Sequence, residues 1–334
     1  MVDKDLSDKI RVTSLIATIF VLYRHSLNYL AFFGTWTGFG INKIVQDSVL
    51  IFTQVAVPYF FIISGFFFCK KQYNTYGKYK TLLYNKIKTL FVPFILWNLF
   101  CLVILFIVNN QALNDISSIS SFIYDLLLSK WDGPLWYVRD LFVLMILVPI
   151  YQWIIYSKYV LIRVLPLLIM FFLWNPVDSS FMSTEAIFFF YIGCLISSDD
   201  DILKYRIKKY LLILPLLFWI SYSIGIFPYN NIIIHRLNTI IGLIIFWQAI
   251  NMLPKYIFKY IMQYSSYSFV IYASHCYFIK IIKNGIALIF RNNELVALLT
   301  FILLPIIVTI LIICIARIWR RYYPISYNIF TGNR

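Results

Sequence analysis

Ten apolar segments run through this sequence, and they constrain its fold more than any other feature. A bilayer core is about 30 Å thick, so a helix that spans it needs about 20 mostly apolar residues. Segments 159–175 and 183–197 are the weakest, and without them the count falls to eight. The sequence therefore predicts an all-α polytopic membrane protein, a bundle of about ten transmembrane helices in a single domain over residues 1–334. The segments lie at about 11–31, 49–69, 89–108, 134–156, 159–175, 183–197, 210–227, 232–252, 264–283 and 295–316.

Charge and composition support this class and set the orientation. The chain is 61% hydrophobic and only 13% charged, which excludes an ordinary soluble domain. Its net charge of +15 comes from 29 Lys and Arg residues. Most of these lie in alternate connections and at both ends, which by the positive-inside rule places both termini in the cytoplasm. We therefore expect membrane lipids, and not nucleic acid, as partners of the basic surface. The first segment lacks a small-residue cleavage site and is predicted to stay as an anchor.

The five cysteines show no metal-binding spacing. They are scattered and lie mostly inside apolar segments, where cysteine usually packs as a small hydrophobic side chain. We therefore expect all five to be packing residues, and we expect no metal site.

Two of the three histidines, His25 and His275, lie inside apolar segments. Ionisable side chains in a bilayer are costly and usually functional. His25 also follows Arg24 directly, which adds to the cost of burial. If the first helix enters the membrane near Arg11, His25 lies about 21 Å along the axis, in the outer half of the bilayer. The sequence predicts His25 as a catalytic residue there.

Other polar residues are predicted at the same outer level, where they would line one hydrated cavity. Arg139 and Asp140 are adjacent and point about 100° apart, so each is expected to need its own partner. Simpler interpretations stay open: ion pairing at a helix start, a favourable helix dipole for Glu185, the headgroup layer for His235 and Arg236, and a structural role for His275. The residues at this level are Trp136, Arg139, Asp140, Glu185, His235, Arg236 and His275.

The second apolar segment ends in SGFFFCKK, and two interpretations of Ser64 and Gly65 stay open. Small residues let helices approach closely, or they leave a narrow passage for a long, thin ligand. The basic segment 70–88 that follows binds either anionic lipid headgroups or the phosphates of a cytosolic donor.

Four motifs, in this order, resemble those of the acyltransferase-3 family of integral membrane acyltransferases. They are LIATIFVLYRHS with its intramembrane histidine, FFIISGFFF, PLWYVRDLFVLMILVPI, and SYSFVIYASH with its Tyr-x-x-His ending at Tyr272 and His275. The ten-helix plan and the length also fit. One position departs from the family pattern: the family usually has an arginine separated from the histidine by ten residues, and that position is Ser14 here. Arg11, about one turn earlier, and Arg24 are the nearest arginines.

The resemblance implies transfer of an acyl group, most often acetyl, from cytosolic acetyl-CoA to a hydroxyl of a surface polysaccharide or its lipid-linked precursor. It also implies a multi-pass location in a bacterial inner membrane and acyl-CoA as a donor substrate, with no bound cofactor. In this scheme His25 acts as a general base or carries the acyl group, and Arg139 stabilises the oxyanion or anchors an acidic sugar. The expected substrate-binding residues are Arg11, Arg24, Ser64, Gly65, Trp136, Tyr137, Asp140, Glu185, Tyr272 and His275.

Two other functions are compatible with these residues. A transporter or flippase for glycan intermediates would use the same polar cavity without CoA, although no inverted repeat is visible. A non-catalytic scaffold would tolerate changes at His25, Arg139 and His275. A DHHC-type palmitoyl transferase is excluded, because its motif is missing.

Overall fold

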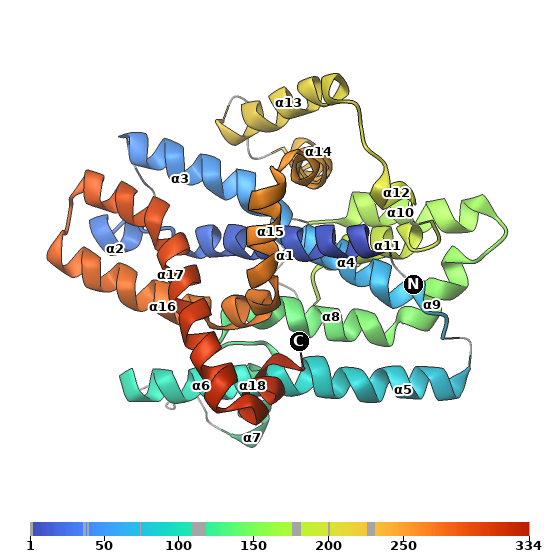
Figure 1. Cartoon of the computed structure of the whole chain (residues 1–334), viewed down its shortest axis with the longest axis horizontal. Coiled ribbons are helices and arrows are strands. Elements are labelled where there is room, and N and C mark those ends of the chain that lie inside the picture. The colour runs from blue at the N-terminus through green and yellow to red at the C-terminus, as the bar shows by residue number, and fades with distance from the viewer. Residues whose placement is uncertain are drawn as a thin grey trace. The chain divides into compact units, whose positions relative to one another are not determined.

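The computed structural model describes residues 3–35, 38, 40–73, 75–108, 118–175, 182–199, 201–225 and 231–333. These residues form helices and no strand, which confirms the all-α class (Figure 1). Six short 3-10 or π segments connect them: η1 (Thr53–Val55), η2 (Ile87–Phe91), η4 (Gly133–Leu135), η5 (Lys209–Leu212), η6 (Ile250–Met252) and η7 (Ser265–Tyr267). The α-helices are α1 (Lys4–His25), α2 (Tyr29–Phe33), α3 (Gly40–Phe52), α4 (Ala56–Lys70), α5 (Tyr76–Lys86), α6 (Val92–Val108), α7 (Ile119–Leu127), α8 (Trp136–Ile146), α9 (Val148–Ile155), α10 (Val160–Leu173), α11 (Thr184–Ile196), α12 (Asp201–Lys204), α13 (Ile213–Ser223), α14 (Ile232–Ala249), α15 (Lys255–Tyr264), α16 (Ser268–Ile289), α17 (Glu294–Tyr322) and α18 (Pro324–Thr331).

Each of the ten predicted segments coincides with helix, although residues 226 and 227 of one segment lie outside the described residues. Ten full spans and cytoplasmic termini remain predictions. Helices α10, α11 and α13 are apolar but short. Within the described residues, five helical stretches are long and apolar enough to cross a membrane: Lys4–Phe33, Gly40–Lys70, Tyr76–Ile107, Ile232–Met252 and Glu294–Tyr322.

A sixth span forms if α8 and α9, which bend by 59°, count as one. The bend falls at Leu147, two residues before Pro149. Proline lacks an amide hydrogen and its ring crowds the preceding turn, so it breaks a continuing helix but is tolerated in the first turn of a new one.

The helices group into two compact units. Unit 1 comprises Met1–Phe60 and Asp200–Ile315, and unit 2 comprises Phe61–Asp199 and Ala316–Arg334. Two of the three boundaries fall inside α4 and α17, so each of these helices contributes to both units. The predicted single domain thus contains two contact-dense parts, and each is described by itself below.

In unit 1, a buried amide network fixes the chain just after α1. The Asn28 side chain donates to the Ala297 carbonyl at 2.6 Å. The Gln46 amide donates to the side-chain oxygens of Asn28 at 2.7 Å and Asn42 at 2.5 Å. Buried amides are stable only when hydrogen-bonded. The network therefore ties the end of α1, where His25 lies, to α3 and α17.

In unit 2, α4 and α11 cross with their backbones in contact. A Cβ at Gly65 would lie 2.1 Å from the Phe190 carbonyl oxygen, and one at Gly193 would lie 2.0 Å from that of Ile62. Only glycine allows so close an approach. Gly65 therefore serves the helix crossing, the first of the two interpretations of the SGF motif.

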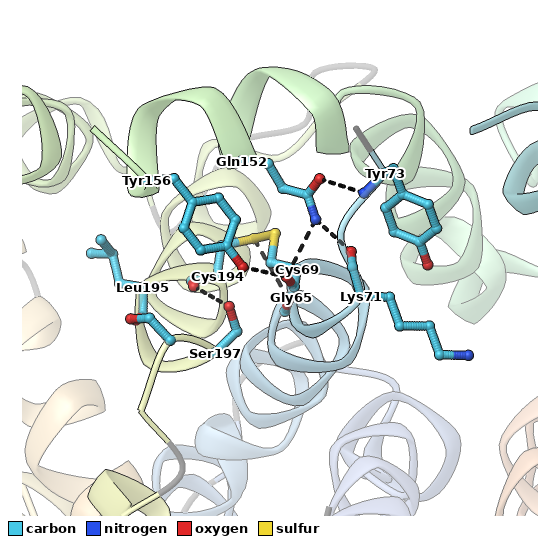
Figure 2. Close-up of a disulfide and its surroundings, with 10 residues drawn as sticks. Gly65, Cys69, Lys71, Tyr73, Gln152, Tyr156, Cys194, Leu195 and Ser197 are labelled. Atoms are coloured by element: carbon cyan, nitrogen blue, oxygen red, sulfur yellow. Dashed lines mark hydrogen bonds between the residues drawn. A yellow bond between two sulfur atoms is a disulfide. The ribbon is translucent and has the colours of Figure 1, made fainter. Parts of the chain in front are cut away.

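A disulfide between Cys69 and Cys194 joins the same two helices one turn further along (Figure 2). The expectation that all five cysteines only pack is wrong for this pair. The Gln152 side chain donates to the Lys71 carbonyl at 2.5 Å and accepts from the Tyr73 amide at 3.0 Å, which holds the chain that leaves α4 (Figure 2).

Gly193→Ala is expected to destabilise the protein by about 1–3 kcal/mol, because backbone, and not a flexible side chain, meets the new methyl group. Thermal unfolding in detergent measures this. Gly285→Ala is the matched control, since a Cβ at this helical glycine has nothing within 4 Å. Equal melting temperatures for the two variants would contradict the close crossing.

Candidate active site

The imidazoles of His25 and His275 lie side by side in unit 1. Helix α1 packs against α16, and the two ring centroids are 5.0 Å apart at an angle of 60°. His275 is fully buried, whereas His25 is exposed. The pair therefore presents one accessible imidazole supported by one enclosed imidazole.

His275 has a defined orientation. Its Nδ1 lies 2.6 Å from the Tyr272 carbonyl oxygen, which can only accept, so Nδ1 carries the proton in this hydrogen bond. In the neutral ring, Nε2 is then the basic nitrogen. Tyr272 thus contacts His275 through its backbone carbonyl, three residues earlier on the helix, and its ring lies 6.1 Å from the imidazole.

Two cations flank His25. The Lys283 ammonium donates to the Leu27 carbonyl at 2.7 Å and to that of His25 at 3.4 Å. Arg24 donates to the Leu50 carbonyl at 3.3 Å and interacts electrostatically with His25 and His235. Sequence reasoning missed Lys283. The only signal is its place about two turns after His275, on the same side of α16.

His235, the remaining histidine of unit 1, has a partner on the preceding helix, α13. His235 Nδ1 lies 3.4 Å from the Tyr222 hydroxyl. The neighbouring Arg236 is buried, with 7% of its surface exposed. Both belong to α14, where the sequence places them at the outer end.

In the middle of α1, two hydroxyl groups meet at Ser14, the position where the resemblance leads us to expect an arginine. Ser14 donates to the Ile10 carbonyl at 2.8 Å, the Tyr59 hydroxyl donates to the same carbonyl at 2.9 Å, and the two hydroxyl oxygens are 3.3 Å apart. Arg11 is exposed. The Lys9 ammonium instead lies 3.7 Å over the Trp247 ring.

Unit 2 contains a cavity of about 800 Å³ beside α4 and α5. The Ser64 and Tyr137 hydroxyl oxygens lie 3.2 Å apart in its wall. Gly65 does not line it. Lysines but no carboxylates are among its lining residues, which are Ser64, Phe67, Phe68, Lys71, Gln72, Tyr73, Gly77, Lys78, Thr81, Leu82, Asn85, Lys86, Leu90, Tyr137, Val138 and Leu141.

Arg139 and Asp140 pair with each other, contrary to the expectation that each needs its own partner. The Asp140 carboxylate accepts from Arg139 Nη2 at 2.7 Å and from Nε at 2.8 Å. The arginine side chain is long enough to curl back over its own helix, so the 100° between adjacent residues does not separate their charged ends. The other Asp140 oxygen accepts from the Ser183 amide at 2.9 Å, at the start of α11.

The other predicted residues of unit 2, Glu185, Trp136 and Tyr137, are partly buried. Glu185 lies in the first turn of α11, where a carboxylate favourably meets the helix dipole. The Trp136 ring lies 6.1 Å, and the Tyr137 ring 4.8 Å, from that of Phe61.

The predicted residues thus form two groups. Unit 1 brings Arg24, His25, Tyr272 and His275 together, and unit 2 pairs Ser64 with Tyr137 and Arg139 with Asp140. His25 belongs to the first unit and Arg139 to the second, so the single hydrated cavity that the sequence predicts for them stays a prediction.

Comparison with known proteins identifies the chain over nearly its whole length. The family model described as an acyltransferase domain, acyltransferase-3, matches residues 14–317, which include parts of both units. No curated protein and no solved structure matches the chain. This chain, an all-helical protein with several membrane-spanning candidates, belongs to the acyltransferase-3 family of membrane acyltransferases.

Proposed function

We propose that the protein is a membrane acyltransferase in the inner membrane of a bacterium. It would transfer an acyl group, for which we propose acetyl, from acyl-CoA to a hydroxyl of a cell-surface polysaccharide or its lipid-linked precursor. Family membership supports acyl transfer in general. The observation that carries the proposal is the exposed His25 imidazole, set on a membrane-spanning candidate beside His275.

In this proposal His25 is the general base. It takes the proton of the acceptor hydroxyl as the hydroxyl oxygen attacks the thioester carbonyl carbon. The carbon–sulfur bond then breaks, and the CoA sulfur leaves as a thiolate that recovers the proton from the imidazolium. Arg24 and Lys283 lie beside His25, so a cation is at hand for the negative charge that develops on the carbonyl oxygen.

The proposed role of Arg139 in oxyanion stabilisation gains less support. Its guanidinium is engaged with Asp140 through two nitrogens. This pairing favours a structural role, in which Arg139 holds Asp140 against the start of α11.

The basic cavity of unit 2 is the proposed site for the CoA phosphates. Lys71, Lys78 and Lys86 line it, and ammonium groups are strong partners for phosphate. Its volume of about 800 Å³ lies within the roughly 300–1,000 Å³ of small-molecule sites. The Ser64 and Tyr137 hydroxyls would contact the pantetheine arm.

The test combines two measurements. Purified protein should consume acetyl-CoA in the presence of glycan acceptor, and surface glycans of a deletion strain should lose acyl groups by mass spectrometry, with recovery on complementation. A transporter would instead change glycan export without acetyl-CoA consumption. That outcome would overturn the proposal.

Lys78→Ala is expected to raise the KM for acetyl-CoA about tenfold with little change in kcat, because a lost hydrogen bond to a charged group costs about 1.5–3 kcal/mol. Steady-state kinetics in detergent measures this. Lys80→Ala is the matched control, since Lys80 is exposed on the same helix but does not line the cavity. Equal KM values for the two variants would favour lipid headgroups as the ligand of the basic segment.

A further inference from the structure

Three side chains that bind transition metals meet where α1 and α16 pack in unit 1. A ring nitrogen of His25, one of His275 and the sulfur of Cys276 all lie within 4.8 Å of one another. Two neutral imidazoles and a thiolate are among the preferred ligands of Zn²⁺. We propose that His25, His275 and Cys276 form a zinc-binding site that leaves a further coordination position open.

The distances are close to those of a zinc site. Zinc bonds of about 2.0–2.1 Å to nitrogen and about 2.3 Å to sulfur place two nitrogens, or a nitrogen and a sulfur, roughly 3.3–3.6 Å apart in a tetrahedral site. The distance from His275 Nε2 to Cys276 Sγ is 3.8 Å. His25 is the exposed member, and its ring nitrogen already lies within 4.8 Å of the other two ligand atoms, so it has to approach them to complete the triangle.

The buried histidine is oriented for this role. Its Nδ1 proton is held by the Tyr272 carbonyl, so the lone pair of the neutral ring is on Nε2, the atom that lies 3.8 Å from Cys276 Sγ. Histidines that ligate metals commonly donate their other ring proton to a backbone carbonyl or carboxylate in this way.

The charges around the site are also compatible with metal binding. Lys283 interacts electrostatically with Cys276, so a metal-bound thiolate there would face an ammonium group. Lys283 and Arg24 themselves repel a cation, but the thiolate offsets one of these charges. We therefore expect reversible binding that responds to zinc concentration, in contrast to a permanently filled structural site.

If His25 is the base, as proposed above, zinc would inhibit acyl transfer, because a metal-bound nitrogen cannot take a proton. This consequence rests on the proposed function, whereas metal binding itself does not. The two are therefore tested by different measurements.

The binding test uses Co²⁺ as a coloured substitute for Zn²⁺ on the purified full-length protein. One Co²⁺ per chain should bind with a near-ultraviolet thiolate charge-transfer band, and excess Zn²⁺ should remove the band. Cys276→Ser should abolish the band and weaken Co²⁺ binding by at least about tenfold, since even the loss of an outer partner of a metal ligand costs about 10–100-fold. His275→Ala should also lose binding.

The chain supplies matched controls. Cys314 is an exposed free cysteine and His235 is the third histidine, and neither belongs to the three-residue group. Cys314→Ser and His235→Ala should keep the band. A band that survives Cys276→Ser, one lost equally in Cys314→Ser, or no Co²⁺ binding by the wild type would each overturn the site. Absence of acetyl-CoA turnover by the wild-type protein and by every variant would overturn the acyltransferase proposal alone. The zinc site would be unaffected, because the cobalt band is measured without turnover.

Discussion

His25→Ala is expected to lower acyl transfer by about 10²–10⁴-fold, the usual contribution of a positioned general base. The substitution removes the exposed imidazole of the pair at 5.0 Å and leaves His275 with its bond to the Tyr272 carbonyl. Because the His25 side chain is exposed, the level of protein in the membrane should stay near that of the wild type. Acetyl-CoA turnover, glycan acylation and membrane level are measured together.

His235→Ala is the control for this experiment, since His235 contacts Tyr222 on α13 and is not part of the His25 pair. Turnover should stay within a few fold of the wild type. Undiminished acylation by His25→Ala at normal membrane level would remove His25 from the mechanism. Labelling of the protein by radioactive acetyl-CoA without acceptor would instead indicate an acyl-histidine intermediate.

The positions of the helices could be predicted from the sequence because bilayer thickness sets the length of an apolar run. The division into continuous spans could not. Leu147 and Pro149 lie inside one apolar run, yet the helix bends there by 59°. Hydropathy is insensitive to such a break, because it does not count backbone hydrogen bonds.

The residues of the candidate site could be predicted from the sequence only where a single residue is unusual for its surroundings. His25 and His275 are conspicuous because an ionisable group in an apolar helix is costly. Nothing in the sequence around Cys276 and Lys283 marks them as site residues. They can be recognised only once α1 is seen to pack against α16. No local sequence pattern predicts such a contact between two helices that are far apart in the chain.

The disulfide is the other feature that the sequence did not predict. Cys69 and Cys194 are 125 residues apart, so spacing alone could not join them. A signal was present in the small residues, since Gly65 lies about one turn before Cys69 and Gly193 lies directly before Cys194. Close backbone approach at the glycines is what brings the two sulfur atoms together.

Asp140→Ala is expected to destabilise the protein by about 3–5 kcal/mol, the cost of leaving one partner of a buried ion pair alone. Asp140 is fully buried, and the Arg139 side chain is 9% exposed. The substitution also removes the acceptor of the Ser183 amide at the start of α11, and loss of such a capping bond costs about 1 kcal/mol by itself. Thermal and denaturant unfolding in detergent measure the change.

Asp125→Ala is the matched control in the same unit. Asp125 pairs with Lys130 at 3.0 Å, but the lysine side chain is 46% exposed, and ion pairs in contact with solvent contribute only about 0–1 kcal/mol. Asp140→Asn keeps an oxygen for the Ser183 amide and loses the charge, so it should fall between the two alanine variants. If Asp140→Ala instead melts with the wild type but loses turnover, the pair acts on substrate, and its role in holding α8 against α11 is wrong.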